Sequence, residues 1–139
     1  EIMAVNIAIV GKDSYIGTSF EKYLEKYLGQ YNIKTIDAVT TLPQDMDFSG
    51  IDVVFHVAGI AHQKETPENA HLYYEINRDL PVEVASKAKK EGVRQFVFLS
   101  SMSVYGLEIG IITRETNPNP KTNYGKSKNP YSWNKQPTQ

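Results

Sequence analysis

Near its amino terminus the chain reads Val5-Asn-Ile-Ala-Ile-Val-Gly-Lys-Asp-Ser-Tyr-Ile-Gly17. The apolar run 5–10 is rich in β-branched residues, which predicts a strand buried in a parallel sheet. Gly11 ends this strand. The apolar residues that follow recur at helical spacing and predict a helix that stops at Gly29. They are Ile16, Phe20, Tyr23, Leu24, Tyr27 and Leu28.

The same alternation of strand and helix continues along the rest of the sequence. The expected elements are strands at 33–37, 52–58 and 95–99, loops at 38–50 and 60–67, and a helix at 68–90. This order is typical of parallel strands joined by right-handed crossovers. We therefore predict an α/β protein with a Rossmann-like, doubly wound parallel sheet.

Composition narrows the classes of protein to consider. The chain has 139 residues, of which 40% are hydrophobic and 22% charged, as in an ordinary globular domain. A net charge of −1 argues against nucleic-acid or anionic-membrane partners. No apolar run approaches the ~20 residues of a membrane span. The absence of cysteine and of a basic, cleavable leader favours a cytoplasmic protein.

The turn between the first strand and the first helix is a candidate phosphate site. Gly11 and Gly17 supply a flexible backbone, and the free N–H groups at the start of a helix bind a pyrophosphate well. Ser14 stands where a middle glycine is common. It is small enough to let a ligand approach, and its hydroxyl could instead cap the helix.

Asp37 ends the predicted second strand, twenty residues after Gly17. A carboxylate there can accept hydrogen bonds from both ribose hydroxyls and would repel a 2′-phosphate, which favours NAD over NADP. Lys12 could soften that preference. The alternative is that Asp37 only forms a turn.

Tyr124-Gly-Lys-Ser-Lys128 follows a serine cluster in Phe98-Leu-Ser-Ser-Met-Ser-Val-Tyr-Gly106. On a helix, Tyr124 and Lys128 lie one turn apart on one face. A phenol ordinarily titrates near pH ~10, and a neighbouring ammonium group favours the phenolate. With the Ser101 hydroxyl on the same substrate oxygen, this set could move a proton while a hydride leaves or joins the carbon. The pair alone more often decorates a solvated helix face.

Together, five ordered motifs make the chain resemble the extended short-chain dehydrogenase/reductase family, in particular its NAD-dependent nucleotide-sugar epimerases and dehydratases. They are Gly11-x-x-Ser-x-x-Gly17, His56-Val-Ala-Gly59, Tyr73-Tyr-Glu-Ile-Asn77, Ser100-Ser-Met-Ser-Val-Tyr-Gly106 and Tyr124-Gly-Lys-Ser-Lys128. The resemblance implies that Ser101 supplies the catalytic hydroxyl, Tyr124 the acid and base, and Lys128 a contact to the nicotinamide ribose. It also implies an NAD site lined by Gly11, Ser14, Tyr15, Ile16, Gly17, Asp37, Val57, Ala58, Gly59, Asn77 and Lys128.

The resemblance further implies a UDP-sugar 4-epimerase that oxidises and re-reduces a sugar hydroxyl. Family dehydratases carry an Asp-Glu pair where this chain has Met102 and Ser103, so elimination of water is disfavoured. The alternatives are a related NAD(P)-dependent sugar ketoreductase and a dinucleotide-binding module without turnover. His56, His62 and His71 lack a carboxylate at ligand spacing, so we expect no metal.

Two prolines bear on the helices. Pro81 cannot donate to the carbonyl of Asn77, so it either kinks a continuing helix or starts a new helical segment. Asn129-Pro130 interrupts the family pattern after Lys128. We therefore expect an NAD-binding domain at 1–128 and an irregular, non-native tail at 129–139. A fragment of this kind, truncated before the substrate domain, should be inactive, and its family dimer helix is interrupted.

Overall fold

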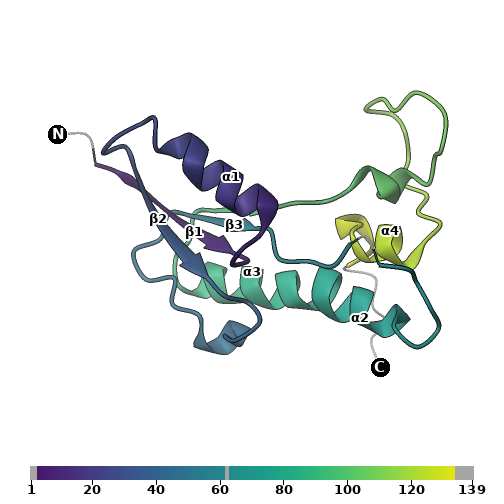
Figure 1. The fold of residues 1–139 in the computed structure, drawn as a ribbon, viewed down its shortest axis with the longest axis horizontal. Coiled ribbons are helices and arrows are strands. Elements are labelled where there is room, and N and C mark those ends of the chain that lie inside the picture. Colours follow the sequence, from purple (N-terminus) through teal and green to yellow (C-terminus); the bar gives the residue numbers. More distant parts are fainter. Residues whose placement is uncertain (1–2, 62, 134–139) are drawn as a thin grey trace. The chain divides into compact units, whose positions relative to one another are not determined.

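The computed structural model describes residues 3–61 and 63–133 (Figure 1). The elements in chain order are β1 (Val5–Val10), α1 (Tyr15–Leu24), β2 (Tyr31–Ile36), β3 (Val53–His56), α2 (Ala70–Tyr74), α3 (Leu80–Lys90), β4 (Gln95–Phe98) and α4 (Asn123–Ser127). Short 3-10 turns lie at Pro43–Asp45, Met102–Tyr105 and Pro130–Ser132, and a π-helical segment, Glu75–Asp79, joins α2 to α3. The chain forms two compact units: residues 1–59 with 80–99, and residues 60–79 with 100–139.

The first unit is built on a parallel sheet with the strand order β2-β1-β3-β4. In this sheet Val10 of β1 is paired with Ile36 of β2 on one side and with His56 of β3 on the other. The chain thus passes from β1 to β2 on one side of β1, and then crosses to the other side of β1 to form β3. This reversal is the mark of a doubly wound sheet, and it confirms the predicted fold class.

Two apolar clusters cover the two faces of the sheet, as the alternation of side chains along β1 requires. One face carries Ala8 and Val10, which pack with Val84 and Ala88 of α3. The opposite face carries Ile7 and Ile9 and packs with α1. In Figure 1, α1 and α3 lie on opposite sides of the strands. Each fully buried aliphatic side chain contributes about 1.5–3 kcal/mol, so the two clusters hold the sheet between its helices.

The predicted apolar stripe of the first helix is confirmed at Phe20 and Leu24, which pack against the sheet. It is wrong at Ile16, Tyr23, Tyr27 and Leu28, which are exposed. The helix ends at Leu24, and Leu28 lies in the following turn with 89% of its surface exposed. Tyr23 and Tyr27 lie on the surface instead, where their hydroxyls are 3.1 Å apart and their rings stack at an angle. Tyrosine has an apolar body and a polar tip, so its spacing imitates a core stripe without requiring burial.

Two strands differ in length from the prediction. The strand expected at 33–37 begins earlier, at Tyr31, and ends at Ile36. The strand expected at 52–58 covers only Val53–His56. It ends there because the N–H groups of Val57 and Ala58 both donate to the Val10 carbonyl, at 3.0 Å each. One carbonyl that receives two donors cannot continue a regular ladder.

The helix expected at 68–90 is present but changes its type along its length. The π-helical segment Glu75–Asp79 interrupts it, and Pro81 lies in the first turn of α3. Pro81 has no N–H to donate to the carbonyls of the turn before it, and the π-helical segment lies directly before this lost hydrogen bond. The structure therefore combines the two alternatives: the helix continues, and Pro81 begins its next α-helical segment.

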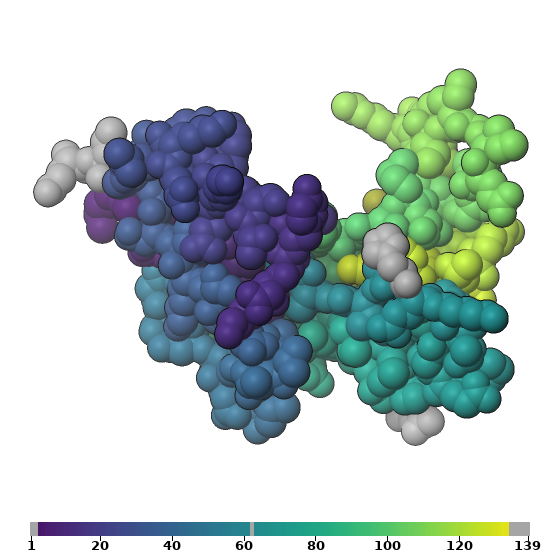
Figure 2. All heavy atoms as spheres, viewed as in Figure 1, coloured from purple at the N-terminus to yellow at the C-terminus, as the bar shows by residue number. Residues whose placement is uncertain are grey.

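The second unit contains a segment around Ile109 and Ile111 that projects from the rest of this unit, shown in light green in Figure 2. Its apolar side chains are exposed, among them Ile109 and Ile111 at 92% and 86%. At the other end of this unit, Pro130–Ser132 forms a turn, and the Trp133 indole N–H donates to the Ser127 carbonyl at 3.3 Å. Residues 134–139 of the predicted tail lie outside the described residues, and the domain boundary at 128 stays a prediction.

Within residues 3–61 and 63–133, no helix is both long enough and apolar enough to cross a membrane.

Candidate active site

The carboxyl ends of β1, β2 and β3 bring the predicted nucleotide residues of the first unit to one edge of the sheet. The N–H of Gly11 donates to the Ile36 carbonyl at 2.9 Å, which places Gly11 beside the end of β2. Val57 and Ala58 are held to the Val10 carbonyl on the other side. This edge carries Gly11, Ser14, Tyr15, Ile16, Gly17, Asp37, Val57, Ala58 and Gly59. A switch point between strands of this kind is where doubly wound sheets bind ligands.

Both glycines of the turn are closely packed, and at Gly11 the packing and the backbone conformation require glycine. Gly11 has a φ of +132°, and a Cβ on it would lie 2.9 Å from the Ala58 nitrogen and from a Val57 methyl group. A Cβ on Gly17 would lie 3.1 Å from an Ile9 methyl and 3.2 Å from the Val57 methyl. The glycines thus let α1 begin directly against the ends of β1 and β3.

Ser14 caps α1. Its hydroxyl oxygen accepts a hydrogen bond from the Gly17 N–H at 3.4 Å, as the capping alternative predicted. The next two side chains project from the first turn of the helix: Tyr15 is 85% exposed and Ile16 is 43% exposed. Both side chains are therefore accessible at this edge of the sheet.

Asp37 follows β2 directly and forms a turn. Its carboxylate accepts the N–H of Val39 at 2.9 Å. That N–H is the main cause of the lowered pKa of the Asp37 carboxyl, with further help from Thr40 and from the positive charge of Lys12. The group is therefore a carboxylate at neutral pH. The turn-forming alternative is confirmed, and the ribose contact stays a prediction.

In the second unit, the serine segment lies directly against the helix that carries Tyr124. A Cβ on Gly125 would lie 2.5 Å from the carbonyl oxygen of Ser103, so only glycine allows this approach. The Ser100 hydroxyl donates to the Lys128 carbonyl at 2.7 Å. Ser101 caps the neighbouring 3-10 turn through the Ser103 N–H, at 3.2 Å. The three predicted catalytic residues thus belong to two segments that are bonded to each other.

Tyr124 and Lys128 lie one helical turn apart, as predicted. Helix α4 spans Asn123–Ser127, and the N–H of Lys128 donates to the Tyr124 carbonyl at 3.1 Å as the last bond of the turn. The Tyr124 ring packs edge-on against the ring of Tyr73, with centroids 6.4 Å apart. Lys128 is 6% exposed, and this burial lowers the pKa of its ammonium group.

The lowered pKa of Lys128 predicts a rise of stability with pH. Unfolding returns the lysine to its ordinary pKa of 10.5, so between the lowered value and 10.5 the unfolded chain binds more protons than the folded one. The free energy of unfolding should increase through that window, and Lys128→Met should remove the increase. Urea unfolding of both proteins from neutral to alkaline pH measures it. Lys126→Met, on the exposed side of α4, should keep the wild-type slope, and equal slopes for Lys128→Met would contradict the prediction.

Asn77 is fully buried, and its side-chain amide is hydrogen-bonded to the backbone of the loop that follows β3. Its Oδ1 accepts the Ile60 N–H at 2.8 Å, and its Nδ2 donates to the Ile60 carbonyl at 3.0 Å and to the Ser127 hydroxyl at 3.3 Å. Ser127 in turn donates to the Tyr124 carbonyl at 2.9 Å. Asn77 therefore connects this loop to the helix of Tyr124. Its predicted place beside the nicotinamide stays a prediction.

Several residues of this network were not predicted from the sequence. Glu65 accepts the N–H groups of Asn123 and Tyr124, and Tyr74 donates its hydroxyl to the Asn123 side chain at 2.8 Å. Both act across large separations in sequence, and no local pattern signals such contacts. Thr122 is different: a threonine before a short helix is an ordinary cap, and its hydroxyl accepts the Gly125 N–H at 3.0 Å.

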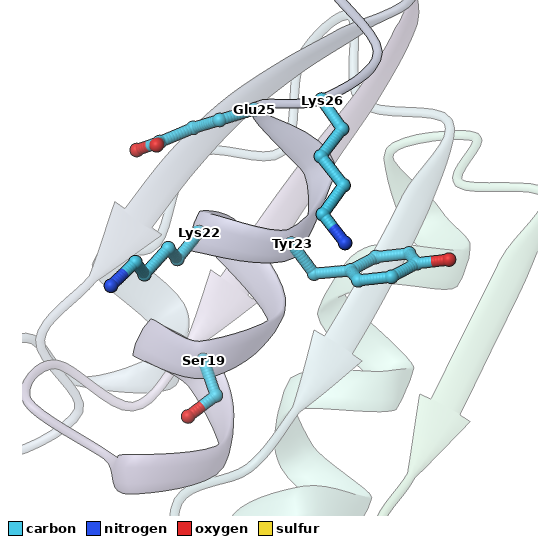
Figure 3. Close-up of a pocket in the computed structure, with 5 residues that line it drawn as sticks. All are labelled: Ser19, Lys22, Tyr23, Glu25 and Lys26. Carbon is cyan, nitrogen blue, oxygen red and sulfur yellow. The ribbon is translucent and has the colours of Figure 1, made fainter.

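Two other features fall outside the predicted site. A shallow depression along α1 is lined by Ser19, Lys22, Tyr23, Glu25 and Lys26, none of which belongs to the predicted cofactor residues (Figure 3). In the part of the chain that the structure describes, no three His, Asp or Glu side chains gather into a metal site. His62, one of the three histidines considered, lies outside the described residues.

Comparison with known proteins identifies the family. The sequence model of the NAD dependent epimerase/dehydratase family matches residues 7–136, which is nearly the whole chain. The chain belongs to this family. The predicted resemblance is thereby confirmed, and so is NAD as the cofactor after which the family is described.

Individual relatives within the family are distant. The chain is 28% identical over 138 residues to the N-acetyl-alpha-D-glucosaminyl-diphospho-ditrans,octacis-undecaprenol 4-epimerase of Escherichia coli O157:H7, covering 88% of this chain and 40% of the relative. It is also 28% identical to the UDP-glucose 4-epimerase of Vibrio cholerae, covering 91% of this chain and 44% of that protein. The chain thus spans less than half the length of these curated relatives.

Solved structures of the family share the fold. The UDP-glucuronic acid 4-epimerase of Bacillus cereus, in complex with UDP-glucuronic acid and NAD, superimposes with a TM-score of 0.76 at 21% identity, covering 89% of this chain and 49% of that one. A dTDP-4-dehydrorhamnose reductase from Clostridium acetobutylicum gives the same TM-score at 24% identity, covering 89% and 46% of the two chains. At these identities the likeness establishes the fold, which epimerases and reductases share.

Proposed function

We propose that the protein to which these residues belong is an NAD-dependent nucleotide-sugar 4-epimerase that acts through Ser101, Tyr124 and Lys128. The observation that carries this proposal is the close contact in the second unit between the serine segment 100–106 and helix α4, which are joined by a hydrogen bond. Gly125 presses against the Ser103 carbonyl, and the Ser100 hydroxyl holds the Lys128 carbonyl. The hydroxyl, the phenol and the amine are thereby supported by one local framework.

Each of the three groups has a separate part in moving the proton. Tyr124, as the phenolate, takes the proton of the sugar hydroxyl and later returns it. The Ser101 hydroxyl binds the same sugar oxygen and steadies the charge on it as the carbonyl forms. Lys128, which is buried and lies one helical turn from Tyr124, binds the nicotinamide ribose. NAD, when bound, would supply the hydride acceptor for oxidation of the sugar carbon and, once reduced, the hydride donor for its reduction on the opposite face.

The first unit holds the dinucleotide in this proposal. The start of α1 offers free N–H groups to the pyrophosphate, and Gly11 lets the backbone approach it. The ionised Asp37 carboxylate accepts the ribose hydroxyls and disfavours a 2′-phosphate. These features favour NAD over NADP, with Lys12 near enough to weaken the preference.

A second candidate is a dinucleotide-binding module without turnover. It is favoured by the fact that the turn, Asp37 and the Val57-Ala58-Gly59 segment all lie in the first unit. A ketoreductase would use the same groups but release its reduced product. A dehydratase is disfavoured, because Met102 and Ser103 provide no acid and base for loss of water.

Titration calorimetry followed by spectroscopy separates these candidates. We expect the purified chain to bind NAD with a dissociation constant below about 1 mM and to bind NADP more weakly. Addition of UDP-glucose or UDP-N-acetylglucosamine to the protein to which these residues belong, loaded with NAD, should produce a reduced-NAD absorbance and the 4-epimer of the sugar. NAD binding without either signal supports the module, and net consumption of reduced cofactor supports a ketoreductase. Failure to bind NAD at millimolar concentration would refute the proposed cofactor site.

A further inference from the structure

Glu65 connects the loop between β3 and α2 to the helix that carries Tyr124. One carboxylate oxygen accepts the N–H of Tyr124 at 2.8 Å, and the other accepts the N–H of Asn123 at 3.1 Å. These N–H groups begin α4, where they have no intrahelical partner. A carboxylate that accepts two of them makes charge-assisted hydrogen bonds, which are shorter and stronger than neutral ones.

Helix α4 depends on such outside contacts. It spans only Asn123–Ser127, far below the ~12 residues at which an isolated helix becomes marginally stable. Its first turn is held at three points: Glu65 binds two N–H groups, Thr122 binds the Gly125 N–H, and the Tyr74 hydroxyl binds the Asn123 side chain. Among these contacts, only the one from Glu65 reaches the backbone of Tyr124.

The loop around Glu65 is itself organised by hydrogen bonds. The Asn69 side chain accepts the Thr66 N–H at 2.8 Å and donates to the Lys64 carbonyl at 3.0 Å. The residues on both sides of Glu65 are therefore fixed by one amide group. Because the loop is fixed, the Glu65 carboxylate has a fixed orientation. Positioning of a catalytic group requires such a fixed support.

We propose that Glu65 is a positioning residue, whose carboxylate fixes the backbone of Tyr124 and thereby the place of its phenol. The inference rests on the proposed function, since it assigns to Glu65 an effect that is exerted through Tyr124. Displacement of a catalytic group by about 1 Å can cost about 10²-fold in rate. Loss of the carboxylate should therefore lower turnover much more than it lowers the affinity for cofactor or sugar.

The test compares Glu65→Gln and Glu65→Ala with the wild type in the protein to which these residues belong. Glutamine keeps one acceptor oxygen and loses the other, so kcat for epimer formation should fall by about tenfold, and by about a hundredfold in the alanine variant. KM for the sugar and the dissociation constant of NAD should change by less than about twofold. The matched control is Glu68→Gln in the same loop, where the side chain is exposed and turnover should be unchanged.

A second readout needs no turnover. Hydrogen exchange of the Asn123 and Tyr124 amides, followed by NMR, should accelerate about tenfold in Glu65→Gln, since loss of a charge-assisted bond is worth about that factor. The Gly125 amide, which Thr122 holds, should change less and reports whether α4 as a whole has melted. Faster exchange at the first two amides, with the NMR signals of the Tyr124 ring displaced, supports the inference even where the wild-type chain shows no turnover and the proposed function fails. Unchanged exchange, or a kcat equal to that of the wild type, would overturn it.

Discussion

Replacing Tyr124 with phenylalanine should lower the rate of epimer formation by about 10²- to 10⁴-fold, the usual contribution of a positioned acid and base. The substitution removes one oxygen and keeps the ring that packs edge-on against Tyr73. It also keeps the backbone N–H that Glu65 accepts. We therefore expect an intact fold with the proton-transfer group missing. The measurement is the initial rate of UDP-sugar interconversion at saturating NAD.

The matched control for this prediction is Tyr131→Phe. Tyr131 lies outside α4 and is 80% exposed, so loss of its hydroxyl should leave the rate within about twofold of the wild type. Calorimetry should give the same NAD affinity for all three proteins. A Tyr124→Phe protein that turns over at the wild-type rate would assign the proton transfer to another group.

The parallel sheet could be predicted from the sequence because its signals are local. The run 5–10 is rich in β-branched residues and carries apolar side chains on both faces, as a strand covered by helices does, and it is found at Val5–Val10. The glycines at 11 and 17 likewise mark backbone that has to approach other atoms closely. Where a single physical reason explains a residue type in a strand or turn, the local sequence is enough to predict that strand or turn.

The limits of α1 and β3 could not be predicted from apolar spacing, because they are set by backbone hydrogen bonds. Helix α1 stops at Leu24 although apolar spacing continues, and the N–H groups of Glu25, Lys26 and Tyr27 donate to the carbonyls three residues before them, as in turns. Strand β3 stops at His56 because the Val10 carbonyl receives two donors. The local spacing of apolar residues indicates neither the end of α1 nor the end of β3.

The candidate site divides in the same way. Tyr124 and Lys128 are recognisable because their chemistry requires those residue types one helical turn apart, and Ser101 because its segment resembles a family motif. Glu65 has no such signature: it lies 59 positions before Tyr124 in a loop whose polar composition is that of any solvated connection. Its contact exists only because the fold brings that loop to the start of α4, so it can be found only from the structure.

Replacing Gly11 with alanine should destabilise the first unit by about 3 kcal/mol, as the sum of backbone strain and overpacking. The φ of +132° is one that side chains rarely adopt, and the added Cβ would meet the Ala58 nitrogen and the Val57 methyl at 2.9 Å. Neither neighbour can withdraw easily, because the N–H groups of both residues are bonded to the Val10 carbonyl. Urea unfolding followed by circular dichroism measures the loss.

Gly50→Ala separates the two causes. Gly50 also has a positive φ, +72°, but a Cβ there would meet no atom within 4 Å. It should therefore cost only the backbone term, about 1–2 kcal/mol. Because Gly11 adjoins the Ile36 carbonyl and the start of the turn, its substitution should also weaken NAD binding by more than about tenfold at a temperature where the variant is still folded. Gly50→Ala should leave NAD affinity unchanged. If the two variants lost equal stability and equal NAD affinity, the close approach of Gly11 to Val57 and Ala58 would not be what shapes the dinucleotide turn.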